Sequence, residues 1–195
     1  MGAWRYSVRR AAGGFLAAAT LAVFARAGVT IHYQGTADSG ESVGKILAAV
    51  SAFAKEHKWK VEDASAPNGK LERQDGEKIM EYHGRVTGVI VQVNEDCEPL
   101  AFQFDTNLFL QDEVKTQFAG VAVHIHVVTL LESLKPFFKE LTVEDEGGYW
   151  DEHDKAALEA RLDEVEAQIA EQKRKHPEIQ TAFHMRNGRI ADVAK

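Results

Sequence analysis

Apolar and polar residues alternate in several short stretches of this chain, and this is the spacing of strands that bury one face. The clearest stretch is 86–93, and 100–104 repeats its pattern after a break at 94–99. We therefore expect two strands joined as a hairpin there. Further strands are predicted at 29–33, 58–61 and 141–143, with a weaker edge strand at 79–83.

Three segments instead show the helical spacing, with apolar residues three or four positions apart. The first, 40–57, follows Asp38 and Ser39, two residues that can cap a helix. The second, 118–135, is apolar almost all round, which predicts a buried helix that Pro136 ends or kinks. The third helix is predicted at 151–175, with Asp151 or Asp154 as its cap and the basic residues Lys173, Arg174 and Lys175 in its last turn.

The remaining stretches show little periodicity. Residues 63–78 contain Pro67, Asn68-Gly69 and Asp75-Gly76, so a long loop is expected. Residues 177–195 are expected to form a poorly ordered tail. Together the elements predict a single α+β domain at 29–176, with an antiparallel or mixed sheet of about five strands and two or three helices packed on one face.

Residues 1–28 precede this pattern and allow two interpretations. Three arginines, an apolar run at 11–24 and the triplet Ala25-Arg26-Ala27 are typical of a secretory signal peptide. Alternatively, the segment is a spurious upstream extension, since the folded pattern begins abruptly at Val29. The second interpretation predicts a cytoplasmic protein, and the first predicts an exported protein that has lost residues 1–27.

Charge and cysteine content limit the classes of partner. The formal net charge of −7 divides into +4 for residues 1–28 and −11 for residues 29–195, so the body lacks the basic footprint that binds nucleic acid. The apolar run at 11–24 is too short for a membrane span. The single cysteine, Cys97, excludes an internal disulfide and a zinc site of several thiolates, and it favours the cytoplasm.

No motif of established chemistry is present: the sequence lacks a phosphate-binding glycine loop, a nucleophile elbow and paired metal-ligand motifs. The most unusual segment is 144–150, where acids and two glycines precede Tyr149 and Trp150. Glu144, Asp145 and Glu146 could bind a hard cation or an amine beside the two rings. We favour the simpler interpretation, a tight turn whose aromatic residues anchor the next helix.

Two histidines, His124 and His126, fall on the apolar helix. Their side chains diverge by about 200° around the helix, so they cannot chelate one ion together. Either could be a single ligand or general base with a distant partner such as His32, Glu146 or Cys97. A core histidine that is hydrogen-bonded to a neighbour is the better expectation.

Polar residues also precede this helix. Lys115, Thr116 and Gln117 lie near its expected N-terminus, where polar groups could hold an anion. We favour simple capping of the helix by Thr116.

Several segments resemble a family of uncharacterised bacterial proteins: Cys97-Glu98-Pro99-Leu100, 114–120 (VKTQFAG), His124-Ile125 and 145–150 (DEGGYW). The family has no established activity, so the resemblance implies no reaction. It covers most of residues 29–175, and members begin close to the first strand, which favours the spurious extension. Through this resemblance, the residues at family motif positions are Lys115, Gln117, His124, Glu146, Tyr149 and Trp150.

Two functions of different classes stay open. The first is a non-catalytic domain that binds a protein or a small molecule, with a homodimer as one arrangement. The second is a small hydrolase-like enzyme that uses His124 as base and Glu146 or Asp145 as orienting acid. No metal or cofactor is predicted. The candidate binding residues are Lys115, Gln117, His124, Asp145, Glu146, Tyr149 and Trp150.

Overall fold

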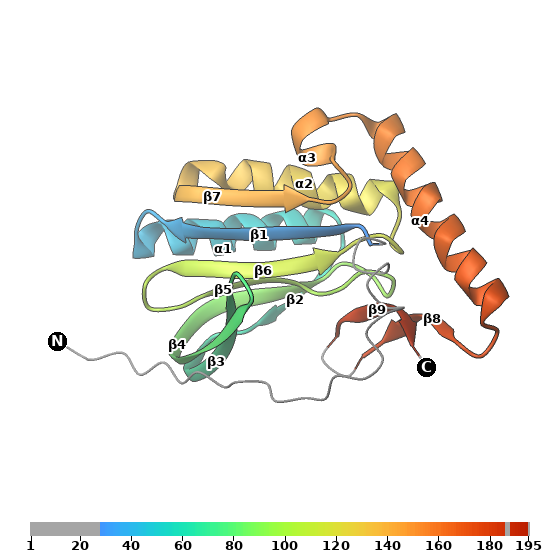
Figure 1. Ribbon diagram of the computed structural model, residues 1–195. Coiled ribbons are helices and arrows are strands. Elements are labelled where there is room, and N and C mark those ends of the chain that lie inside the picture. The colour runs from blue at the N-terminus through green and yellow to red at the C-terminus, as the bar shows by residue number, and fades with distance from the viewer. Residues whose placement is uncertain (1–27, 186–187, 195) are drawn as a thin grey trace.

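Figure 1 shows an antiparallel three-stranded sheet at the centre of the computed structural model, which describes residues 28–185 and 188–194. Its strands, in spatial order, are β6 (Phe109–Lys115), β1 (Thr30–Ala37) and β7 (Phe138–Asp145). Helices α1 (Gly40–Glu56) and α2 (Val121–Leu134) run along the face turned away from the viewer (Figure 1). No described helix covers the opposite face, which we call the open face.

The alternation of residues along β1 decides which of its side chains face the helices. Ile31 and Tyr33 are buried, whereas His32 and Gln34 are on the open face. Gly35 is also buried. A Cβ there would lie 2.5 Å from the carbonyl oxygen of Glu140 on β7, so the close approach of the two strands requires glycine. The chain pattern that predicts this strand therefore also sets the orientation of its polar residues.

A second antiparallel sheet contains β2, β3, β4 and β5. Strand β4 is 15 residues long, so it pairs with β3 through its first half and with β2 and β5 through its second half. The hairpin of β3 and β4 projects across β6 on the open face (Figure 1). The bounds are β2 (Lys60–Asp63), β3 (Ala66–Asp75), β4 (Lys78–Gln92) and β5 (Leu100–Phe104).

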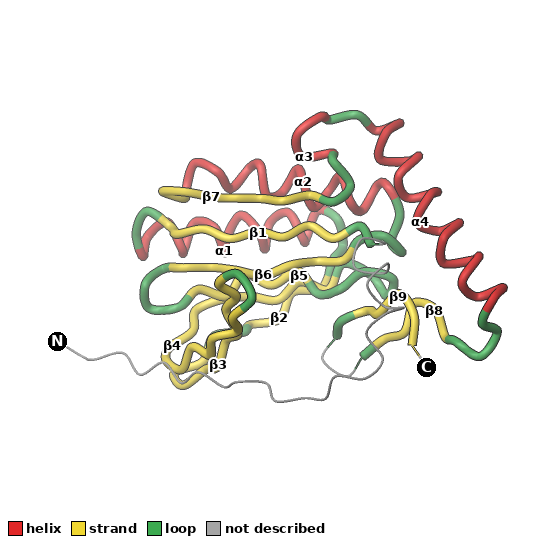
Figure 2. Tube along the Cα trace, in the orientation of Figure 1, coloured by secondary structure: helices red, strands yellow, loops and turns green. Residues whose placement is uncertain are grey.

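The C-terminal part of the chain packs at one end of the central sheet. Helix α4 stands against α2, α3 and the strand β8, as Figure 2 shows, and β8 pairs with β9. None of the helices within 28–185 and 188–194 is long and apolar enough to cross a membrane. The bounds are η2, a 3-10 turn (Lys135–Phe137), α3 (Tyr149–Glu152), α4 (Lys155–Lys175), β8 (Gln180–His184) and β9 (Ile190–Ala194).

The starts of α1 and α4 follow the sequence signals. Ser39 caps α1 by accepting a hydrogen bond of 3.1 Å from the Ser42 amide. Asp154 caps α4 by accepting hydrogen bonds from the amides of Ala156 and Ala157. Both caps supply an acceptor for helix amides that have no partner within the helix.

The α+β class is confirmed, but the predicted count of about five strands is wrong. Within the described residues there are nine strands in three sheets and four α-helices. The sequence pattern misses β6 because three polar residues, 111–113, interrupt its apolar alternation. It reads β3 as a loop because Leu71 and Arg73 are the buried residues of a strand that is otherwise largely exposed.

The C-terminal residues also differ from the prediction. A poorly ordered tail is expected there, but 180–184 and 190–194 form a pair of strands. Polar contacts hold this hairpin on the body, since Arg189 pairs with Glu98 and Asp112. Hydrophobic periodicity carries no signal for such contacts. The segment 1–28, predicted as a signal peptide or a spurious extension, lies outside the described residues except for Gly28.

Candidate functional site

The residues predicted as a site gather at one end of the central sheet, where β1 begins and β6 and β7 end. Thr30 pairs with Lys115 on β6, and Ile31 pairs with Asp145 on β7, so β1 holds the two motif segments side by side. We call this place the motif end; it consists of Lys115, Gln117, His124, Asp145, Glu146, Tyr149 and Trp150.

His124 is wholly buried, and both of its ring nitrogens have hydrogen-bond partners. Nδ1 lies 2.7 Å from the Thr116 hydroxyl, and Nε2 donates to Oδ2 of Asp145 at 3.0 Å. Thr116 is therefore not the helix cap that the sequence predicts, since α2 begins only after Gly120. Instead, the three side chains connect the end of β6, through α2, to the end of β7.

Asp145 organises the turn that follows β7. Besides His124, its carboxylate accepts hydrogen bonds from the amides of Gly147 at 2.8 Å and Trp150 at 3.0 Å. Burial opposes ionisation, but the contact with His124 and these two amides lower the pKa of Asp145 overall. Gly147 is required by packing, because a Cβ there would lie 2.9 Å from the His124 ring.

Gln117 and Glu146 hold the start of β1 through its backbone. The side-chain oxygen of Gln117 accepts a hydrogen bond of 2.9 Å from the Val29 amide. The carboxylate of Glu146 accepts a hydrogen bond of the same length from the Thr30 amide. Both predicted residues thus satisfy backbone groups where β1 begins, at the end of the sheet.

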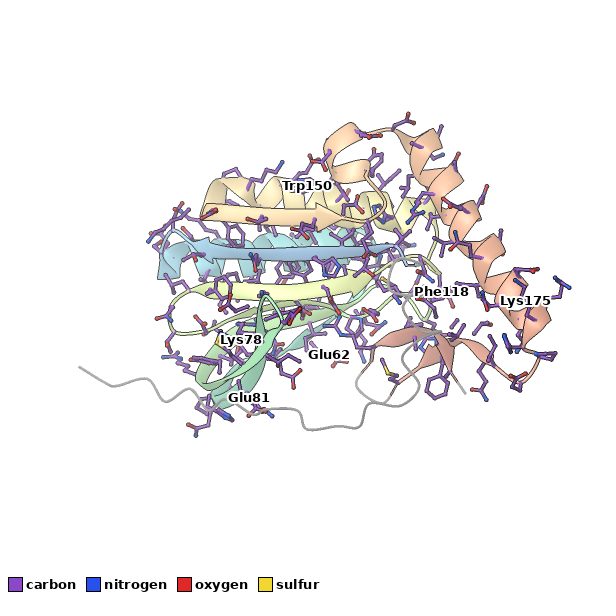
Figure 3. The ribbon with its side chains drawn as sticks, viewed as in Figure 1. Glu62, Lys78, Glu81, Phe118, Trp150 and Lys175 are labelled. Atoms are coloured by element: carbon purple, nitrogen blue, oxygen red, sulfur yellow. The ribbon has the colours of Figure 1, made fainter. Side chains whose placement is uncertain are left out.

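The other predicted residues make contacts of the same structural kind. Lys115 forms an ion pair of 3.2 Å with Asp192 of β9, and that carboxylate also accepts a hydrogen bond from Gln117. Tyr149 and Trp150 pack partly buried against the main core. The Lys135 ammonium lies 4.0 Å from the centre of the Trp150 ring, which Figure 3 labels beside α3.

The motif end brings together the base and acid that a hydrolase-like mechanism would use, but both are inaccessible. The side chains of His124 and Asp145 have no exposed surface, and neither nitrogen of His124 is left for a substrate. Glu146, the other acid considered, lies 3.8 Å from His32 instead. These contacts fit residues that hold strands and helices together.

A groove of about 580 Å³ lies on the open face of the central sheet, beside the motif end. The hairpin of β3 and β4 and the side chain of Arg189 form its walls. Two rows of side chains cross the three strands and form its floor. We call it the sheet-face groove; the rows are Glu113, His32, Glu144 and Gln111, Gln34, Thr142.

Gln111 fixes the β3–β4 hairpin above this floor. Its amide nitrogen donates to the Gln34 side chain at 2.8 Å and to the Gln74 carbonyl at 2.9 Å. Its amide oxygen accepts from the Gln74 backbone amide at 2.7 Å. Ile79 also lines the groove, and 63% of its surface is exposed. The groove therefore has a fixed wall with an apolar, accessible side chain.

His32 is the cation of the floor. Its Nδ1 lies 3.0 Å from a Glu113 oxygen, and its Nε2 lies 3.8 Å from a Glu146 oxygen. These two contacts raise the pKa of His32 to about 10 against the opposing effect of partial burial. The hydrogen bond from His32 also lowers the pKa of Glu113. The imidazolium and its carboxylates are therefore all charged at neutral pH.

The two arginines of the groove are occupied by contacts within the protein. Arg189 pairs with Asp112 at 2.7 Å and with Glu98 at 3.1 Å. Arg73 is 8% exposed, and its terminal N–H groups donate to backbone carbonyls of β3, β5 and β6. Neither guanidinium is free to bind a ligand as its principal partner.

The sequence reasoning misses this groove. Of the acids considered as cation ligands, Glu144 is part of the floor, and Glu146 contacts the floor residue His32. Part of the lining lies on β6, which the pattern misses, and in segments that it reads as loop and tail, whereas His32 and Thr142 lie on strands that it predicts. One signal was present: the polar positions His32 and Gln34 alternate with buried ones on β1, which indicates an uncovered face.

Comparisons with known proteins give no relative: no family model, no curated protein and no solved structure matches this chain. The resemblance of the motif segments to uncharacterised bacterial proteins therefore stays a prediction.

Proposed function

We propose that this protein is a non-catalytic binding domain and that its ligand is a small polar molecule with an amino or amidino cation. The ligand lies in the sheet-face groove. The observation that carries this proposal is the charge left over in the groove. Glu72 and Glu144 line it, and neither has an ion-pair partner among residues 28–185 and 188–194.

Most of the remaining charges of the groove are paired within the protein. His32 is paired with Glu113, and Arg189 is paired with Asp112. Arg73 carries a positive charge, but its terminal donors are used by strand carbonyls. A cation that approaches Glu144 therefore meets carboxylates that do not have to give up another partner.

The size and the lining of the groove support a small ligand. Its volume of about 580 Å³ falls within the usual range for small-molecule sites. Amide and hydroxyl groups of Gln34, Gln111 and Thr142 can add hydrogen bonds, and Ile79 can cover an apolar part of the ligand. The described residues of the lining include no serine, cysteine or lysine, and both nitrogens of His32 face carboxylates, so binding is supported better than catalysis.

The experiment is calorimetric titration of the purified chain with agmatine, spermidine and arginine amide, and with glutamate and glucose as comparison probes. We expect a cationic probe to bind, and we expect its affinity to fall as salt is added. Glu144→Gln and Glu72→Gln should each weaken that binding several-fold. Glu95→Gln is the matched control, because Glu95 is exposed and does not line the groove.

Two results would contradict the proposal. One is binding of glutamate or glucose as strongly as any cationic probe. The other is an unchanged affinity for the cation in the Glu72→Gln, Glu144→Gln double variant, provided that its circular dichroism matches that of the unmodified chain.

A further inference from the structure

Two histidine rings from different helices meet at the surface away from the sheet-face groove. His57 follows the last residue of α1, and His126 lies on α2; their ring centroids are 4.4 Å apart, in edge-to-face orientation. Both residues are partly exposed. Phe53 stacks on His57 at 4.1 Å, and the Trp59 ring lies 5.2 Å from His57. We call His57 and His126 the histidine pair.

The spacing of the histidine pair matches that of two imidazoles on one metal ion. With metal–nitrogen bonds of about 2.0–2.1 Å, rings at adjacent coordination positions have centroids roughly 4.5–5 Å apart. The observed 4.4 Å lies just below that range, and the edge-to-face rings have to turn so that a nitrogen of each faces the same ion. Because the residues come from two helices, the 200° divergence that separates His124 from His126 does not apply to them.

A backbone contact already orients His57 as a ligand. Its Nδ1 lies 2.9 Å from the Phe53 carbonyl oxygen, which can only accept, so Nδ1 carries the hydrogen. In the neutral ring, the lone pair is then on Nε2. Metal-binding histidines are commonly held in this way by a carbonyl or carboxylate behind the ring.

His126 is half-buried and its ring lies against that of His57. Within the described ranges, no hydrogen bond from a protein group occupies either ring nitrogen of His126. Its nitrogens are therefore available to an incoming ion.

We propose that His57 and His126 form a binding site for a divalent transition-metal ion of the copper, nickel and zinc class. No group of three or more histidine, cysteine, aspartate or glutamate residues that could hold a metal occurs within 28–185 and 188–194. The protein thus supplies two ligands, and water fills the other positions. Binding is weaker than at structural zinc sites with four ligands, and Cu²⁺ is preferred over Ni²⁺ and Zn²⁺.

The neighbouring Trp59 provides the measurement. The full chain, free of any affinity tag, is titrated with Cu²⁺ and with Ni²⁺ while tryptophan fluorescence is recorded. A paramagnetic ion on the histidine pair lies close to Trp59, so we expect strong quenching that saturates at one equivalent. Trp59→Phe should lose this quenching while calorimetry still reports the bound ion.

Ligand variants and a matched control decide the assignment. His57→Gln and His126→Gln should each weaken Cu²⁺ affinity at least about tenfold. His153→Gln, which changes an exposed histidine paired with Glu132, should leave the affinity unchanged. In the unmodified chain, Zn²⁺ should shift the imidazole nitrogen resonances of His57 and His126 alone, a readout that does not depend on any variant folding.

The proposal is overturned if Cu²⁺ affinity survives in the His57→Gln, His126→Gln double variant. It is also overturned if Zn²⁺ shifts the resonances of other histidines and leaves these two unchanged. Neither outcome affects the cation site proposed for the sheet-face groove, because no residue is shared between the two sites.

Discussion

The charge on His32 links the floor of the sheet-face groove to the stability of the sheet. Its pKa of about 10 lies above the value of about 6.5 expected in the unfolded chain. Because the pKa is raised in the folded chain, protonated His32 stabilises the fold. This stabilisation is fully present below about pH 6.5 and is lost as the pH rises towards 10. Solvent screening reduces its size, because 42% of the side chain is exposed.

We therefore expect the urea midpoint of the unmodified chain to fall between about pH 6.5 and pH 10. In His32→Gln this fall should be smaller, since the variant has no proton to lose at that position. His83→Gln serves as the control, because His83 is an exposed histidine that contacts Glu81. Equal pH dependence in all three proteins would show that His32 titrates at an ordinary value.

For single residues, the sequence predicts whether a side chain is buried better than it predicts the hydrogen-bond partners of that side chain. His124 is the hydrogen-bonded core histidine that its apolar neighbours lead one to expect. Its partners, Thr116 and Asp145, come from the ends of two strands that only the tertiary fold brings together. Similarly, His126 was considered as a ligand with a distant partner, but nothing in the sequence distinguishes His57 as that partner.

Strand β6 shows why the elements themselves were only partly predictable. One of its edges pairs with β1, and the other is bonded by side chains and by the backbone amides of Glu98 and Asp105. Arg73 donates hydrogen bonds of 3.1–3.3 Å to carbonyls of Gln103, Phe109 and Gln111, and Arg189 donates to the Glu113 carbonyl. Apolar periodicity finds β1, whose burial follows its alternation, and β5, whose large apolar residues are all buried, but it cannot find a strand that polar contacts hold in place.

We expect Arg73→Met to lower the free energy of unfolding by about 2 kcal/mol, because buried strand carbonyls lose their donors. Methionine keeps much of the side-chain volume, so the change tests the hydrogen bonds more than the packing. Urea denaturation gives the value, and Arg174→Met on the exposed face of α4 is the control. A variant as stable as the unmodified chain would mean that burying the charge costs as much as its hydrogen bonds contribute.

For the whole molecule, the sequence predicts one α+β domain that ends near residue 176, whereas the structure extends the folded body to the C-terminal hairpin. Glu98, which is 4% exposed, shows how the hairpin is joined to the body. Its carboxylate accepts from the Lys115 amide, from the Ile190 amide and from Arg189. Arg189 also lines the sheet-face groove, so the C-terminal hairpin contributes both to the fold and to the proposed site.

A chain that ends at residue 176 should therefore be less stable than the full chain by roughly 3 kcal/mol, because Glu98 and Asp112, both largely buried in the full chain, lose the cation that pairs with them. Arg189→Gln should reproduce most of this loss, since it removes the charge and keeps the strands. Denaturation midpoints give both values, and amide exchange at Lys115 gives a local one, because Glu98 accepts from that amide. If truncation lowers stability while Arg189→Gln does not, packing of the hairpin rather than its charge holds it on the body. If neither change lowers stability, residues 177–195 are the dispensable tail that their sequence predicts.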